Sequence, residues 1–96
     1  MDIKIKTLKF EAGEKLLAFV EKKVARLEKF VDDRVETVEV SLEDCKDGKK
    51  VKIQIHAAGN NFIVDRAADT FENAVTLCVD LMKEQLTRAK EKKEDR

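Results

Sequence analysis

The chain has 96 residues, of which 43% are hydrophobic and 42% charged, and its 20 basic residues balance 20 acidic ones. This length suits one domain with a modest core, and the regular recurrence of apolar residues excludes a disordered chain. No apolar run approaches the roughly 20 residues that span a bilayer, and the N-terminus has no signal-peptide centre, so we expect a single cytoplasmic domain over residues 1–96.

The first predicted elements are a strand and a long helix. Over residues 2–9, isoleucines alternate with lysines, which is typical of a strand with one buried face. A helix is predicted over 13–30, because at about 100° per residue its apolar side chains gather on one face around Val24. That face comprises Leu16, Val20, Val24, Leu27 and Val31.

The predicted helix carries four cations on the ridge opposite its apolar face, namely Lys15, Lys22, Arg26 and Lys29. Taken singly, a lysine is usually no more than a solvated side chain. Here Lys22 and Arg26 are four residues apart, so their like charges cost a few tenths of a kcal/mol, whereas pairing for solubility would interleave acids with bases. A segregated cationic ridge in a chain of zero net charge therefore indicates a polyanionic partner, most often nucleic acid.

Three strands are predicted next, over residues 37–43, 50–55 and 62–66, because apolar side chains again alternate with polar ones. Turns are expected at 44–48 and 58–61, so the first two strands form a hairpin with one buried and one charged face. The outward face of this sheet lacks aromatic residues. We therefore expect recognition of RNA through its backbone and shape rather than by base stacking on the sheet.

A second helix is predicted after Asp69, which would cap it, with Glu72 completing a capping box. Its apolar face comprises Phe71, Val75, Cys78, Met82, Leu86 and Ala89. Cations flank this face, and their aliphatic stems can cover its edge while the charges reach water or a ligand. Residues 91–96 have little to bury, and we expect this tail to fray.

Together these elements predict an α+β domain with the order β-α-β-β-β-α. Because every strand alternates, one face of a four-stranded sheet meets water and both helices pack on the other face. The expected architecture is a two-layer sandwich of one sheet and two helices.

The sequence carries no catalytic or metal-binding constellation. His56 has outward parity on its predicted strand, and no pattern supplies it with a cysteine nucleophile or a metal partner. Cys45 lies in a predicted turn and Cys78 on an apolar helix face, which suits neither a disulfide framework nor a zinc site. We therefore expect no enzymatic activity, no cofactor, no metal and no small-molecule substrate.

Two segments of the chain resemble one known family. Residues 19–30, Phe-Val-Glu-Lys-Lys-Val-Ala-Arg-Leu-Glu-Lys-Phe, resemble the first helix of the bacterial ribosome hibernation-promoting factors, also called ribosome-associated translation inhibitors or sigma-factor modulation proteins. Residues 71–93 are similar to the second helix of that family. The turn at 59–61 also fits, so the likeness covers essentially the whole chain in the same element order.

This resemblance implies a fold similar to a double-stranded-RNA-binding domain, in a short-form member that is monomeric off the ribosome. Such a protein binds the small ribosomal subunit in the channel used by mRNA and tRNA, blocks translation and preserves idle ribosomes under stress or in stationary phase. Leu81 and Glu84 stand where many relatives carry bases, which thins the cationic surface of the second helix. The RNA-binding residues implied by position are Lys22, Lys23, Arg26, Lys29, Lys83, Arg88, Lys90, Lys92 and Lys93.

A protein-interaction module is the alternative hypothesis. Acids outnumber bases in residues 31–48, so this acidic hairpin, or a free sheet edge, would bind a protein while the lysines only keep the chain in solution. Loss of binding in a hairpin variant, with binding kept in a first-helix variant, distinguishes this hypothesis from RNA binding.

Overall fold

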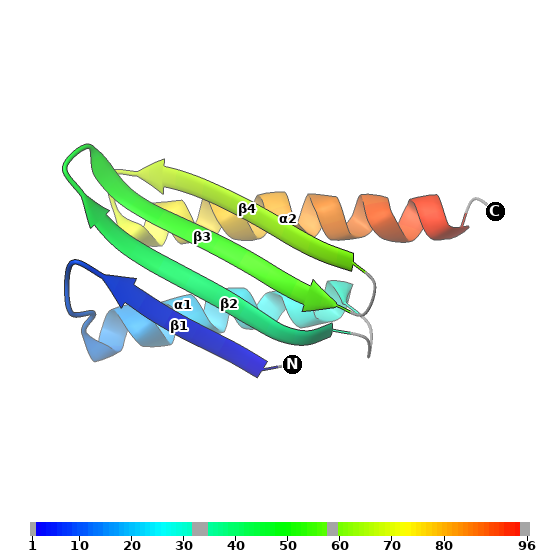
Figure 1. Ribbon diagram of the computed structural model, residues 1–96, viewed down its shortest axis with the longest axis horizontal. Helices are drawn as coiled ribbons and strands as arrows, with labels where there is room; N and C mark the ends of the chain where they lie inside the picture. The colour runs from blue at the N-terminus through cyan, green and yellow to red at the C-terminus, as the bar shows by residue number, and fades with distance from the viewer. Residues whose placement is uncertain (1, 32–34, 58–59, 95–96) are drawn as a thin grey trace.

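The computed structural model describes residues 2–31, 35–57 and 60–94 and confirms the predicted order β-α-β-β-β-α. One sheet contains four strands, which are β1 (Asp2–Leu8), β2 (Val35–Cys45), β3 (Gly48–Ala57) and β4 (Asn60–Ala68). The helical layer contains α1 (Glu14–Ala25), a 3-10 helix η1 (Arg26–Phe30) and α2 (Phe71–Glu94). Both helices lie on one face of the sheet, as the two-layer prediction requires (Figure 1).

The strands follow the chain order β1-β2-β3-β4 across the sheet. β1 is parallel to β2, so α1 and η1 form the crossover that a parallel pair requires. The other neighbours are antiparallel, and only Lys46 and Asp47 separate β2 from β3. Gly48 follows with φ +152°, and a Cβ there would meet the Ala68 carbonyl oxygen at 3.0 Å, so this tight hairpin requires glycine.

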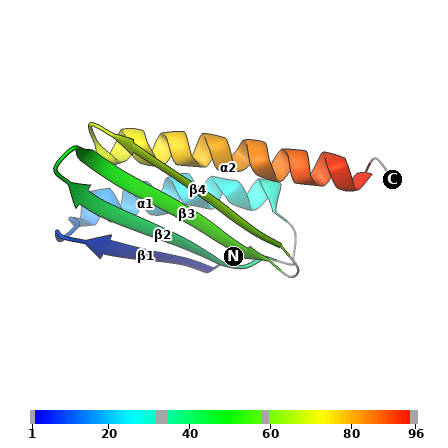
Figure 2. The same cartoon turned by 45° about the horizontal axis from the view of Figure 1, so that its top comes forward.

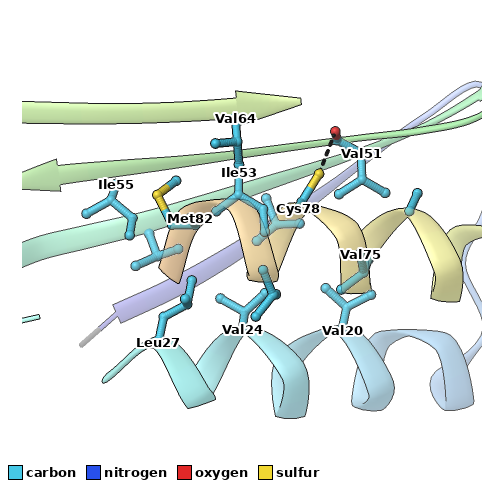
Figure 3. Close-up of a cluster of buried hydrophobic side chains, with 14 of the residues drawn as sticks. Val20, Val24, Leu27, Val51, Ile53, Ile55, Val64, Val75, Cys78 and Met82 are labelled. Atoms are coloured by element: carbon cyan, nitrogen blue, oxygen red, sulfur yellow. Dashed lines mark hydrogen bonds between the residues drawn. The ribbon is translucent and has the colours of Figure 1, made fainter. Parts of the chain in front are cut away.

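The core fills the space between the sheet and the two helices. α1 and η1 contribute Val20, Val24 and Leu27, each with 0% exposure, and these side chains point toward α2 and the sheet (Figure 3). Burying one such aliphatic side chain stabilises the fold by roughly 1.5–3 kcal/mol. The buried partners from the sheet and α2 are Val38, Val40, Leu42, Val51, Ile53, Ile55, Val64, Phe71, Ala74, Val75, Cys78, Val79, Met82 and Leu86.

Several element bounds differ from those predicted. The helix predicted over 13–30 is α-helical only to Ala25, because the Arg26 N–H donates to the carbonyl oxygen of Lys23, three residues back, and the chain winds on as η1. β4 begins at Asn60 rather than at residue 62, since backbone pairing of Asn60 and Asn61 with β3 overrides their turn preference. The rest of that predicted turn, residues 58–59, lies outside the described residues.

The two ends of α2 also differ from the prediction. The cap is Thr70 and not Asp69, because the Thr70 hydroxyl oxygen accepts a hydrogen bond from the Asn73 N–H at 3.1 Å. Asp69 instead accepts from the Asn73 side-chain amide at 2.9 Å, and the predicted capping box with Glu72 is therefore wrong by one residue. At the other end the helix includes residues 91–94 of the tail that was expected to fray, and residues 95–96 lie outside the description.

The turn after β1 is tied to the second helix and to β2. Lys9 adopts φ +70°, a left-handed conformation, and Phe10 stacks on Phe71 with ring centroids 4.7 Å apart. The Lys9 ammonium lies 3.1 Å from a carboxylate oxygen of Glu43. This hydrogen bond lowers the pKa of Glu43 and raises the pKa of Lys9 from their ordinary values.

Cys78 is a core residue, as its position on the apolar helix face predicts. Its thiol is 0% exposed and donates to the Val51 carbonyl oxygen at 3.3 Å (Figure 3). Burial raises the pKa of Cys78 to about 11, so the reactive thiolate is scarce at neutral pH. Cys45, at the end of β2, is only half-buried.

The two thiols should therefore react at different rates. In the folded protein at pH 8, an aromatic disulfide reagent should modify Cys45 quickly and Cys78 only on the timescale of unfolding. In urea both should react at similar rates. Peptide mapping of the labelled positions measures this difference, and rapid labelling of Cys78 in the folded state would contradict the buried position assigned to it.

The Lys9–Glu43 pair should give stability that depends on pH. A carboxyl whose pKa is lowered on folding stabilises the protein above its unfolded pKa, about 4.5, and that contribution is lost as the pH falls through the lower folded value. Glu43→Gln should therefore destabilise the protein at pH 7 and have a smaller effect at pH 3. Urea unfolding at both pH values tests this, and a difference that stays constant with pH would contradict it.

Candidate functional site

A groove of about 440 Å³ runs between the first and second helices. The described residues that line it belong to the helical layer. α1 and η1 supply Lys23, Arg26, Lys29 and Phe30, and α2 supplies Thr76, Val79, Asp80 and Lys83. The groove therefore joins two segments about fifty residues apart in the sequence, which lie side by side in both views of the chain (Figures 1 and 2).

The cations in the first wall of the groove, on α1 and η1, are spaced three residues apart. Lys23, Arg26 and Lys29 follow one another at this spacing through the junction of α1 and η1. Residues three apart eclipse one another in a 3-10 helix, so the winding of η1 sets Lys29 in line with Arg26. Leu27, which is fully buried, anchors this segment on the core and leaves Arg26 and Lys29 exposed.

The second wall is one face of α2. Thr76, Val79, Asp80 and Lys83 recur at the three- and four-residue spacing of a helix face. The Lys83 ammonium lies 5.2 Å from the centroid of the Phe30 ring, a cation–π contact that reaches across to the opposite wall. The Thr76 hydroxyl donates to the Glu72 carbonyl oxygen at 2.9 Å.

The charge of the groove is strongly positive. Its lining contains four cationic side chains and one carboxylate, that of Asp80. None of these four cations forms an ion pair with an acid in the described part of the chain. Cations that packing holds close together attract an anion, and phosphate is the anion that fits several such donors at once.

The outward face of the sheet is different, because its charges alternate in sign. Lys4 lies opposite Glu39, and Lys52 lies opposite Asp65, in neighbouring strands. His56 and Glu39 approach to 3.1 Å across β3 and β2. Although the net charge is zero, the charges are distributed unevenly. The outward sheet face carries both signs, and the groove in the helical layer is mainly positive.

The structure gathers four of the nine predicted RNA-binding residues into this groove, namely Lys23, Arg26, Lys29 and Lys83. Lys22 is exposed on α1 but does not line the groove, because it lies on the solvent side of the helix rather than on the flank that faces α2. The predicted cationic ridge through Lys15 and Lys22 is therefore not the ridge that meets the second helix.

The basic end of α2 lies apart from the groove. Arg88 is exposed and holds the Glu84 carboxylate at 2.5 Å, so its charge is already paired. The last turns of α2 extend beyond the end of η1 (Figures 1 and 2). Lys90, Lys92 and Lys93 belong to these turns, and their side chains lie outside the described part of the structure.

Sequence reasoning missed part of the lining. Phe30 and Val79 belong to neither of the predicted apolar faces, and Asp80 is not among the predicted site residues. The recurrence of Thr76, Val79, Asp80 and Lys83 on one helix face was the signal that could have grouped them. Among the described residues there is no group of three or more potential metal ligands, and the helices described include none long and apolar enough to cross a bilayer.

Comparison with known proteins gives a consistent picture. The family model described as "Sigma 54 modulation protein / S30EA ribosomal protein" matches residues 3–94. The chain is 27% identical over 96 residues to a ribosome hibernation promoting factor of Azotobacter vinelandii, covering 100% of this chain and 89% of that protein.

Two solved structures share the fold. The N-terminal domain of Thermus thermophilus Protein Y matches with a TM-score of 0.80 and 27% identity, covering 92% of this chain and 98% of that one. A ribosomal subunit interface protein from Coxiella burnetii matches with a TM-score of 0.82 and 19% identity, covering 94% and 98%. At that identity the second likeness supports the fold alone.

Proposed function

The chain belongs to the sigma 54 modulation protein / S30EA ribosomal protein family, and from that premise we propose that it is a ribosome-associated hibernation factor. Its partner is the small ribosomal subunit, and it acts in the cytoplasm, where ribosomes are. The ribosome hibernation promoting factor to which it is similar over its whole length supports this assignment.

The observation that carries the proposal is the cationic groove between the helices. Lys23, Arg26, Lys29 and Lys83 come from both walls of the groove at a spacing fixed by the packed core, and within the described residues none of them pairs with an acid. Ribosomal RNA offers folded phosphate backbone, which such a set of cations grips without reading sequence. Each phosphate contact releases counterions, so binding weakens steeply as the salt concentration rises.

The proposed mechanism is steric and involves no reaction. The domain measures 45 × 23 × 19 Å, so a copy bound in the channel for mRNA and tRNA fills space that those RNAs need. A rigid sandwich is suited to this task because its groove face can hold rRNA while its bulk excludes the translating ligands. Translation is then blocked, and idle ribosomes are preserved under stress.

The contacts described for the acidic hairpin do not favour the competing protein-interaction module, and residues 32–34 of the acidic segment lie outside the described part of the chain. The Glu43 carboxylate is held by Lys9, and the Asp44 carboxylate accepts from the Lys49 ammonium at 2.6 Å. A basic protein partner would have to displace these bonds within the chain. The groove cations form no ion pair with a described acid, so RNA would not have to displace such a bond. RNA binding is therefore the function that the geometry supports best.

Charge reversal in the groove tests this proposal. Arg26→Glu with Lys29→Glu should abolish co-sedimentation with small ribosomal subunits at moderate salt, because the groove then repels phosphate. Both side chains are exposed, so the melting temperature should change little. The measurement is sedimentation through sucrose, with circular dichroism to verify folding.

A matched control reverses two lysines on the outward sheet face. Lys6→Glu with Lys52→Glu makes the same change in net charge, and both positions flank Ser41 in neighbouring strands. This variant should still sediment with subunits. Binding that survives the groove variant, or that is lost equally in both variants, would contradict the assignment of the groove.

Competition tests the occlusion mechanism separately from binding. If the domain fills the decoding channel, then saturating amounts of it should prevent initiator tRNA and a short mRNA from binding purified small subunits, and the groove variant should not. Filter binding of labelled tRNA measures this. Simultaneous binding of the domain and tRNA would exclude occlusion while leaving ribosome binding intact.

A further inference from the structure

Asp80 is the feature of the groove that phosphate binding does not explain. Its exposed carboxylate shares the lining with four cations, and it has no ion pair with a base in the residues that the structure describes. A carboxylate only accepts hydrogen bonds, as phosphate does, so the two cannot bond to one another. On electrostatics alone, Asp80 weakens the grip of the groove on every RNA.

A carboxylate in this place can instead accept hydrogen bonds from the edge of an unpaired base. The Watson–Crick edge of guanine presents two parallel donors, its ring N1–H and its exocyclic amino group, which match the two oxygens of one carboxylate. Uracil offers one N–H beside two repelling oxygens. Sequence-specific recognition of RNA usually targets bases that have left their stack, through this edge.

The groove has the dimensions and lining for one nucleoside. Its volume of about 440 Å³ lies within the range of pockets that hold small ligands, and it is far too small for a duplex. Val79 and Phe30 supply apolar surface, and Arg26 is an exposed lining residue whose planar guanidinium can stack on a base. Lys23 and Lys29 remain for the flanking phosphates.

We propose that Asp80 binds the Watson–Crick edge of an unpaired guanine that enters the groove, while the surrounding cations hold its flanking phosphates. This inference rests on the proposed function, since it names the element of RNA that the groove selects. It assigns to Asp80 the role of choosing a base and to the cations the role of supplying affinity.

Replacing Asp80 by asparagine separates this proposal from simple electrostatics. Asp80→Asn removes a negative charge at nearly constant shape, so a purely electrostatic groove binds all RNA more tightly. If Asp80 holds guanine, the same change weakens binding of guanine-containing RNA, because the asparagine amide places a donor against a guanine donor. Binding of RNA without guanine should be unchanged or tighter.

The experiment uses the full chain and three fluorescent RNA hexamers that differ at one central position. The hexamers carry guanosine, inosine or uridine in an otherwise all-uridine strand, and fluorescence anisotropy measures their affinities. The wild type should prefer guanosine to uridine on the order of ten-fold, as expected for a bidentate contact. Inosine, which lacks the amino group, should bind with intermediate affinity. Asp80→Asn should abolish these differences.

The control variant is Glu84→Gln, which removes a charge from the same helix but outside the groove, where Glu84 pairs with Arg88. It should keep the preference for guanosine. The proposal is overturned if Asp80→Asn binds all three hexamers more tightly with unchanged ratios, or if the wild type binds none of them or shows no preference. In each of these cases, continued sedimentation of the wild type with small subunits leaves the proposed function standing, whereas loss of sedimentation overturns that as well.

Discussion

The packing of two helices side by side on one sheet face is the constraint on which the site depends. Val20, Val24 and Leu27 are fully buried in that layer, and each contributes roughly 1.5–3 kcal/mol of burial. Like charges three or four residues apart on a helix cost only a few tenths of a kcal/mol per pair. The free energy of burial in the core therefore exceeds the cost of placing the groove cations close together. As a result, the groove is already positive in the protein without RNA.

Much of the fold could be predicted because the sequence has two clear periods. Alternation marked the four strands, and the spacing around Val24 identified the buried face of the first helix, since each pattern records which side chains meet the core. Element ends were predicted less well. Thr70 rather than Asp69 caps α2, and Asn60 joins β4, because local hydrogen bonds decide these positions among residues of similar preference.

The sequence predicted only part of the site. Helical periodicity tells which residues are exposed, but it does not tell which flank meets a neighbouring helix. That choice, Lys23 and not Lys22, follows from where α2 packs, and the position of Lys29 follows from the 3-10 winding of η1. Helical spacing could place Asp80 on one face with Lys83, but only the structure shows that this face meets cations about fifty residues earlier in the chain.

The most direct test of the central claim is a cryo-electron microscopy structure of the chain bound to the small ribosomal subunit. We expect the groove between α1 and α2 to face rRNA, with the side chains of Lys23, Arg26, Lys29 and Lys83 within hydrogen-bond distance of phosphate oxygens. The outward sheet face should point away from the RNA. A complex in which that sheet face or the acidic hairpin makes the contact, with the groove open to solvent, would contradict the account.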